Sequence, residues 1–121
     1  MKPKYSFFKN ANYALQGLKQ AVKNEMSFKI ELVCVCVLSI ILIFLEISIL
    51  EKLIMFIVLI LILISELINT AIENVVDLIT SDYQILAKIA KDIASAIVFL
   101  SINLAIIVWC VILFYNFKQY F

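Results

Sequence analysis

Histidine and arginine are absent from this chain of 121 residues, and glycine and proline occur once each. Without histidine, proton transfer at neutral pH falls to carboxylates, lysines or tyrosines. Without arginine, and with a formal net charge of only +1, the chain lacks the basic surface and the bidentate side chains that proteins use to bind nucleic acid. A single glycine leaves no Gly-rich phosphate-binding loop. We therefore expect no nucleic-acid partner and no Walker-type nucleotide site.

Charged residues are scarce, whereas apolar residues form long runs. The chain is 16% charged and 65% hydrophobic, with a mean hydropathy of +1.11. Soluble domains are roughly half apolar and about a quarter charged. The length accommodates about three membrane-spanning helices of ~20 residues each, with no separate soluble catalytic domain. The composition predicts an all-α integral membrane protein of one domain, residues 1–121.

The apolar pattern divides this domain into four helical segments. Residues 1–29 are predicted to form an amphipathic helix that lies on the membrane surface, because apolar residues recur there at helical spacing. The apolar runs predict transmembrane helices at about 30–45, 53–79 and 93–117. Three cysteines lie in these runs without the paired spacing of a metal site, and we interpret them as buried apolar residues: Cys34, Cys36 and Cys110.

The distribution of lysines predicts the orientation. Six lysines precede the first apolar run, and Lys88 and Lys91 lie between the second and third. These two regions share one side if three helices cross the membrane, and the opposite side holds only Lys52 and Lys118. Positive residues accumulate on the cytoplasmic side. We therefore expect a cytoplasmic N-terminus.

Five polar residues share one face of the second transmembrane segment. At ~100° per residue they fall within a narrow arc: Glu66, Asn69, Thr70, Glu73 and Asp77. A carboxylate in the middle of a spanning helix costs about 2.5 to 3.5 kcal/mol on insertion scales and therefore usually marks function. The alternative is that Glu73 and Asp77 lie beyond the hydrocarbon, as the solvated end of a long helix. This alternative applies more to Asp77 than to Glu66.

Two of these carboxylates are predicted to lie at different depths in the membrane. If the hydrocarbon begins at Leu53, ~20 residues place its cytoplasmic boundary near Ile72. Glu73 would then lie at the interface and Glu66 roughly 10 Å below it. Such a separation suits a reaction between a water-soluble donor and a lipid headgroup.

Glu25 is a third candidate, because it faces the apolar stripe at the end of the surface segment. Glu25 and Glu73 could meet at the interface around a cation, and Mg²⁺ suits carboxylate ligands better than zinc does. The equally supported alternative is an ordinary ion pair between Glu25 and Lys29, four residues later.

Two further interpretations concern the acidic and the small residues of the spanning helices. Acidic residues in a membrane helix also occur in cation pathways, but such a pathway needs polar groups through the whole membrane, and Leu53 to Ile64 has none. The small residues of the third span predict close helix packing: Ala87, Ala90, Ala94, Ser101 and Ala105.

The stretch Glu66 to Asp77, followed by Lys91 and Asp92, closely resembles the signature of prokaryotic diacylglycerol kinases. The pair Asn24 and Glu25, with Phe28 and Glu31, is similar to the segment that precedes the first span in that family. Trp109 and Cys110 resemble its last helix. The likeness covers nearly the whole chain.

This resemblance implies a homotrimer with composite active sites, in which ATP phosphorylates diacylglycerol to phosphatidate with the help of Mg²⁺. Glu66 is implied as the general base, with Asn69 supporting the catalytic site, and Glu25 and Glu73 as the magnesium ligands. The implied nucleotide-binding residues are Ser6, Tyr13, Glu25, Glu73, Asp82, Tyr83, Gln84, Lys91 and Asp92. The implied lipid-binding residues are Asn10, Ala11, Asn12, Tyr13, Ala14, Leu15, Ser27, Phe28, Lys29, Ile30, Glu31, Glu66, Ser95, Trp109, Cys110, Val111, Ile112, Leu113 and Phe114.

Two departures concern the substrates. Ser6 stands where close relatives carry a basic residue near the nucleotide and the lipid headgroup. Leu86 to Lys88 resembles the undecaprenol kinase branch, which shares the fold and mechanism but phosphorylates a polyprenyl alcohol. Asn24 with Glu25, and Trp109 with Cys110, favour diacylglycerol as the substrate.

Overall fold

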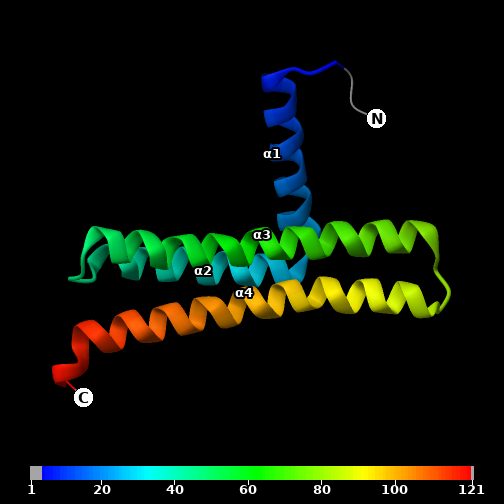
Figure 1. Ribbon diagram of the computed structural model, residues 1–121. Helices are drawn as coiled ribbons and strands as arrows, with labels where there is room; N and C mark the ends of the chain where they lie inside the picture. The colour runs from blue at the N-terminus through cyan, green and yellow to red at the C-terminus, as the bar shows by residue number, and fades with distance from the viewer. Residues whose placement is uncertain (1–3, 121) are drawn as a thin grey trace.

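The computed structural model describes residues 4–120, which fold into four α-helices and one short 3-10 helix. They are α1 (Phe7–Asn24), α2 (Met26–Phe44), α3 (Ile49–Ile79), α4 (Ile85–Phe117) and η1 (Lys118–Tyr120). Helices α2, α3 and α4 lie side by side, each antiparallel to the next along the chain, and α1 projects crosswise from this bundle (Figure 1). The prediction of an all-helical chain with three long apolar helices is confirmed.

The bend between α1 and α2 is centred on Glu25. This residue has an extended backbone, with φ −109° and ψ 108°, and it caps both helices. Residues 26–29 therefore belong to α2 and not to the surface segment, where the sequence had placed them. Phe28 accounts for the difference, because its side chain is only 2% exposed and anchors the first turns of α2 to the bundle.

Helices α2, α3 and α4 are each long enough and apolar enough to cross a membrane. The 19 residues of α2 extend for about 28 Å, close to the ~30 Å thickness of the hydrocarbon core. The 31 residues of α3 and 33 of α4 extend for about 46 and 50 Å. The surplus length projects beyond α2 at the end where α3 connects to α4 (Figure 1).

Helix α4 begins at Ile85, eight residues before the expected third span. Lys88 and Lys91 consequently lie on a helix and not in a loop. Their regular spacing lets Lys88 Nζ pair with Asp92 Oδ2, four residues later, at 2.6 Å. From this helical extension Lys91 also reaches α3, where its Nζ pairs with Asp77 Oδ1.

Small side chains bring α4 close to α3, which confirms the packing role of the small-residue stripe. Ala94 is fully buried and Ala105 is 5% exposed. Two polar contacts extend the same interface toward the other end of the bundle: Trp109 Nε1 donates to Met55 O at 3.1 Å, and Asn116 Nδ2 donates to Glu51 Oε2 at 2.7 Å. Backbone proximity and specific hydrogen bonds therefore fix the α3–α4 pair.

The cysteines are not buried, so the prediction for them was wrong. Cys34, Cys36 and Cys110 are free thiols, and each is exposed on the surface of the single chain. Helical geometry gives the reason, because a helix that contacts its bundle along one stripe leaves residues on its other faces open to the surroundings. These positions are therefore open to the surroundings of the single chain.

Replacing Ala94 by leucine tests this close packing. Extra methyl and methylene groups at a fully buried position force the two helices apart, and such overpacking costs about 1–3 kcal/mol. We expect Ala94→Leu to lower the thermal unfolding temperature in detergent micelles. Ala96→Leu is the matched control, because Ala96 is exposed on the same helix. Equal unfolding temperatures for the two variants would contradict the packing assignment.

Candidate functional site

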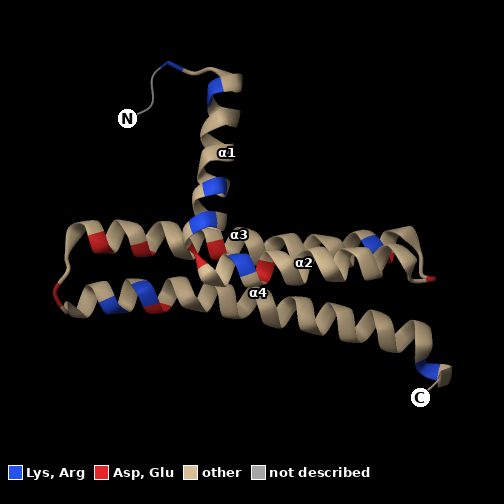
Figure 2. Ribbon diagram, turned by 180° about the vertical axis from the view of Figure 1, so that it is seen from behind, with Lys and Arg blue, Asp and Glu red and all other residues tan. Residues whose placement is uncertain are grey.

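Acidic residues gather where α1 meets α2 and α3, and a second charged group lies along α3 and α4 near their connection (Figure 2). The first group centres on Glu66 and Asn69 of α3, which are only 6% and 8% exposed. They are buried because they occupy the face of α3 that packs on its neighbours. A carboxylate and an amide in this position need polar partners.

The partners of Glu66 come from three parts of the chain. The side chains of Asn69 and Glu31 lie close to its carboxyl group, and it experiences the charges of Glu73 and Glu25. Of the residues that the sequence had singled out for catalysis and metal binding, Asn69 lies beside Glu66, and Glu25 and Glu73 are near enough for their charges to act on it. Glu25 reaches the cluster because the bend between α1 and α2 is centred on it.

The hydrogen bonds in this cluster leave acceptor atoms unused. Asn69 Nδ2 donates to Glu73 Oε1 at 3.2 Å. Among residues 4–120, buried Asn69 Oδ1 and Glu31 Oε2 have no hydrogen-bond partner. Ionised carboxylates only accept hydrogen bonds, so neighbouring glutamates cannot satisfy one another. The cluster is therefore suited to receive a hydroxyl donor, a proton or a cation.

Glu31 is the member of the cluster whose role sequence reasoning missed. It had entered only as one of many lipid contacts, whereas its carboxyl group faces that of Glu66 across the α2–α3 interface. A signal was present, because Glu31 is an acidic residue inside an apolar run, and such residues usually mark function. The periodicity of α3 alone could not reveal which residue of α2 would face it.

Glu25 has no ion pair with Lys29, within the part of the chain that the structure describes. The two residues share only a backbone hydrogen bond, from Lys29 N to Glu25 O at 3.1 Å. Sequence spacing had left the ion pair and the convergence with Glu73 equally supported. The charge of Glu25 acts on Glu66, and the convergence of Glu25 with Glu73 stays a prediction.

The second charged group surrounds a hollow at the α3–α4 connection. This hollow has a volume of ≈ 470 Å³. Its lining includes five residues that the resemblance implied as nucleotide contacts: Asp82, Tyr83, Gln84, Lys91 and Asp92. Lys91 Nζ pairs with Asp77 Oδ1 of α3 at 2.7 Å and also experiences the charge of Glu73. Lys91 therefore connects the hollow to the buried acidic cluster.

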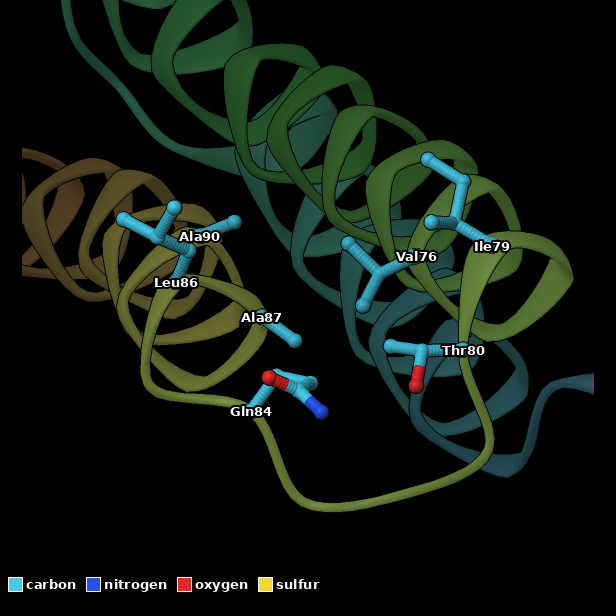
Figure 3. A pocket seen from close by; sticks show the side chains of 7 residues that line it. All are labelled: Val76, Ile79, Thr80, Gln84, Leu86, Ala87 and Ala90. Atoms are coloured by element: carbon cyan, nitrogen blue, oxygen red, sulfur yellow. The ribbon is translucent and has the colours of Figure 1, made fainter.

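An apolar hollow of ≈ 500 Å³ adjoins the charged one (Figure 3). Val76 and Ala87 point toward one another across it from α3 and α4, and the polar ends of Thr80 and Gln84 lie at its rim (Figure 3). The two hollows share four lining residues: Val76, Thr80, Gln84 and Ala87. The α3–α4 connection thus offers an apolar space beside a charged one.

The structure separates the remaining predicted residues into three regions. Ser6, Asn10, Ala11 and Asn12 lie toward the end of α1 that stands away from the bundle (Figure 1). Ala14 and Glu25 instead line a hollow of ≈ 820 Å³ between α1 and α3. Ser95 is exposed on α4, one helical turn after Lys91, and Trp109 to Phe114 lie on the opposite half of α4. A single chain therefore does not gather all the predicted substrate contacts.

The oxygen atoms of the acidic cluster are suitable ligands for a magnesium ion. All are carboxylate or amide oxygens, and one amide oxygen, Asn69 Oδ1, is buried and free to accept. Among residues 4–120, no three His, Cys, Asp or Glu residues come close enough to enclose a metal by themselves. Mg²⁺ typically uses only one or two carboxylates, together with substrate phosphates and water. The cluster therefore matches a site that is completed by a nucleotide.

Comparison with known proteins shows the family of the chain. The sequence profile of the family described as "Prokaryotic diacylglycerol kinase" matches residues 12–113. The chain belongs to the prokaryotic diacylglycerol kinase family. It is 38% identical to the diacylglycerol kinase of Escherichia coli K12 over 109 residues, which cover 90% of this chain and 89% of that protein.

Two further relatives are named for different lipid substrates. The diacylglycerol kinase of Haemophilus influenzae is 40% identical over 106 residues, which cover 88% of this chain and 90% of the relative. The undecaprenol kinase of Bacillus subtilis is 38% identical over 92 residues, which cover 76% and 75%. This diacylglycerol kinase family member is therefore a lipid kinase, with ATP as the co-substrate that kinase activity implies.

Proposed function

We propose that this protein transfers the γ-phosphoryl group of ATP to the hydroxyl of diacylglycerol, yielding phosphatidate and ADP, with Glu66 as general base. The observation that carries the proposal is the burial of Glu66 among side chains that accept hydrogen bonds. A lipid hydroxyl supplies the missing donor, and its proton can pass to the carboxylate. The buried position excludes competing water, which favours transfer to the lipid over hydrolysis of ATP.

Glu66, Asn69 and Lys91 each have a separate role in the proposed reaction. Glu66 accepts the hydroxyl proton while the lipid oxygen forms a bond to the γ-phosphorus and the bond from phosphorus to the ADP oxygen breaks. Asn69 keeps Glu73 oriented through its amide hydrogen bond. Lys91 brings a positive charge to the phosphates. Catalysis of this kind depends on alignment and charge stabilisation, and no covalent enzyme intermediate is needed.

Glu25 and Glu73 are the residues that would hold Mg²⁺. Glu73 lies on α3 between buried Glu66 and exposed Asp77, and Glu25 lies at the bend between α1 and α2. Bound between these carboxylates, Mg²⁺ would supply positive charge that neutralises the phosphates of ATP. Without it, two carboxylates and the nucleotide phosphates would repel one another.

The crosswise direction of α1 supports a site at the cytoplasmic membrane surface. If α1 lies in the headgroup layer, its hollow against Leu67, Thr70, Ala71 and Asn74 marks where α3 leaves the membrane. Glu66 then lies just below this level, and Asp77 and Lys91 lie beyond it. This arrangement presents ATP from the cytosol to a lipid whose hydroxyl lies at the boundary, in the inner membrane of a bacterium.

A homotrimer completes the site in this proposal. Ser6 and Asn10 lie toward the distal end of α1, and the nucleotide hollow lies at the α3–α4 connection, so one chain does not unite them (Figure 1). Exposed apolar side chains cover the long helices, among them Phe99 and Leu100 at 67% each. Packing of three chains would cover part of this surface and supply α1 contacts from a neighbour.

A direct comparison of two lipid alcohols tests the function. Purified protein is supplied with Mg·ATP and either diacylglycerol or undecaprenol in mixed micelles, and radioactive phosphate in the lipid fraction is counted. We expect faster transfer to diacylglycerol. Faster transfer to undecaprenol would support the alternative that the Bacillus subtilis relative suggests. The kinase proposal fails if neither lipid is labelled while the protein remains folded.

A further inference from the structure

The ion pair between Asp77 and Lys91 joins the cytoplasmic ends of α3 and α4. Asp77 Oδ1 and Lys91 Nζ are 2.7 Å apart, although the residues are 14 positions apart in the sequence. Both side chains are accessible, at 63% for Asp77 and 41% for Lys91. Exposed ion pairs contribute little to stability because water and salt screen them. Holding the helices together is therefore a weak explanation for this pair.

Lys91 has no acidic partner on its own helix. Facing positions on an α-helix are three or four residues away, and for Lys91 they are Ala87, Lys88, Ala94 and Ser95. The adjacent residue, Asp92, is engaged by Lys88 at 2.6 Å. The acidic groups that act on Lys91 are instead Asp77 and Glu73 of α3. Without Asp77, the long Lys91 side chain would be free to swing into the cytosol.

We propose that Asp77 is a positioning residue that holds the Lys91 ammonium over the face of α3 carrying Glu73 and Glu66, ready for the transferred phosphoryl group. The inference rests on the proposed function, in which Lys91 contacts the phosphates. Asp77 itself does not touch the reacting atoms. Its contribution is to orientation, because a flexible lysine must otherwise be ordered during the reaction.

The asparagine variant separates orientation from nucleotide attraction. Asp77→Asn removes a negative charge from the hollow, so electrostatics alone would leave the KM for ATP unchanged or lower it. Loss of orientation would instead lower kcat, which we expect to fall about 10- to 100-fold. Asp77→Glu keeps the carboxylate and should retain most of the wild-type kcat. Equal unfolding temperatures for the three proteins would show that the fold is intact.

Chemical labelling of lysines tests the same inference without any activity measurement. In the absence of nucleotide, each protein is treated briefly with an acetylating reagent, and the modification of individual lysines is quantified by mass spectrometry. Only a free, unprotonated amine attacks the reagent, so Lys91 should react several-fold faster in Asp77→Asn than in the wild type. Lys88 is the internal control, because its partner Asp92 is unchanged and its rate should stay the same.

Three results would overturn the inference. They are an unchanged Lys91 labelling rate in Asp77→Asn, a kcat within about twofold of the wild type, or a loss of kcat in Asp77→Glu as large as in Asp77→Asn. A wild-type protein inactive on both lipids would contradict the proposed function instead. In that case, the Lys91 and Lys88 labelling rates would still decide whether Asp77 holds Lys91.

Discussion

Replacement of Glu66 by glutamine is expected to abolish lipid phosphorylation almost completely. Glutamine has nearly the same shape and can still occupy the buried position beside Asn69 and Glu31, but its neutral amide cannot accept the hydroxyl proton. General bases contribute roughly 10²- to 10⁴-fold to reaction rates. We therefore expect kcat to fall by about this factor, measured as initial transfer of labelled phosphate to the preferred lipid.

The fold should survive this substitution. Removing the charge of Glu66 relieves the repulsion that Glu73 and Glu25 exert on it, so the variant should unfold at a temperature equal to or above that of the wild type. Glu46→Gln is the matched control, because Glu46 is exposed in the connection between α2 and α3 at the opposite end of the bundle. Near-normal turnover of Glu66→Gln would remove Glu66 from the role of general base.

Replacement of Glu73 by glutamine should raise the Mg²⁺ concentration needed for activity. The glutamine oxygen can still accept the hydrogen bond from Asn69 Nδ2 that Glu73 Oε1 accepts at 3.2 Å, so the change removes mainly a charge. A neutral amide oxygen is a weaker ligand for this hard cation than a carboxylate. Even substitutions beside metal ligands cost about 10- to 100-fold in affinity. We expect the half-saturating Mg²⁺ concentration to rise by at least ~10-fold.

The measurement is a titration of Mg²⁺ at fixed ATP and saturating lipid. Glu25→Gln should shift the titration in the same direction, since Glu25 contributes the second carboxylate. Glu51→Gln is the control, because Glu51 serves a hydrogen-bonding role at the opposite end of α3, with Ser48 and Asn116. Superimposable titrations for Glu73→Gln and the wild type would contradict the assignment of Glu73 as a ligand.

The helices and the polar face of α3 could be predicted from the sequence for a simple physical reason. Apolar runs of this length are stable as helices across a membrane, where the backbone must satisfy its own hydrogen bonds. Helical periodicity then places Glu66, Asn69 and Glu73 on one face of α3 without knowledge of any other segment. The family signature added roles for these residues. Neither argument required the packing of the chain.

The helix boundaries near the site were harder to predict, because local composition competes with packing. Met26 to Lys29 resemble the polar surface segment, yet Phe28 is buried in the bundle and starts α2 there. Lys88 and Lys91 resemble a loop, yet their helix begins at Ile85. In both regions, contacts that the sequence does not reveal outweighed the local signal.

By itself, the sequence determined three helices long and apolar enough to span a membrane and an acidic face on the central one, because periodicity and apolar length act within single segments. The lipid kinase activity followed from the family resemblance and not from periodicity. Only the tertiary structure decided that Glu31 of α2 opposes Glu66 and that Asp77 of α3 holds Lys91 of α4. Those pairs join different helices, and their partners depend on how the helices rotate and register against one another. No spacing along one helix encodes that rotation.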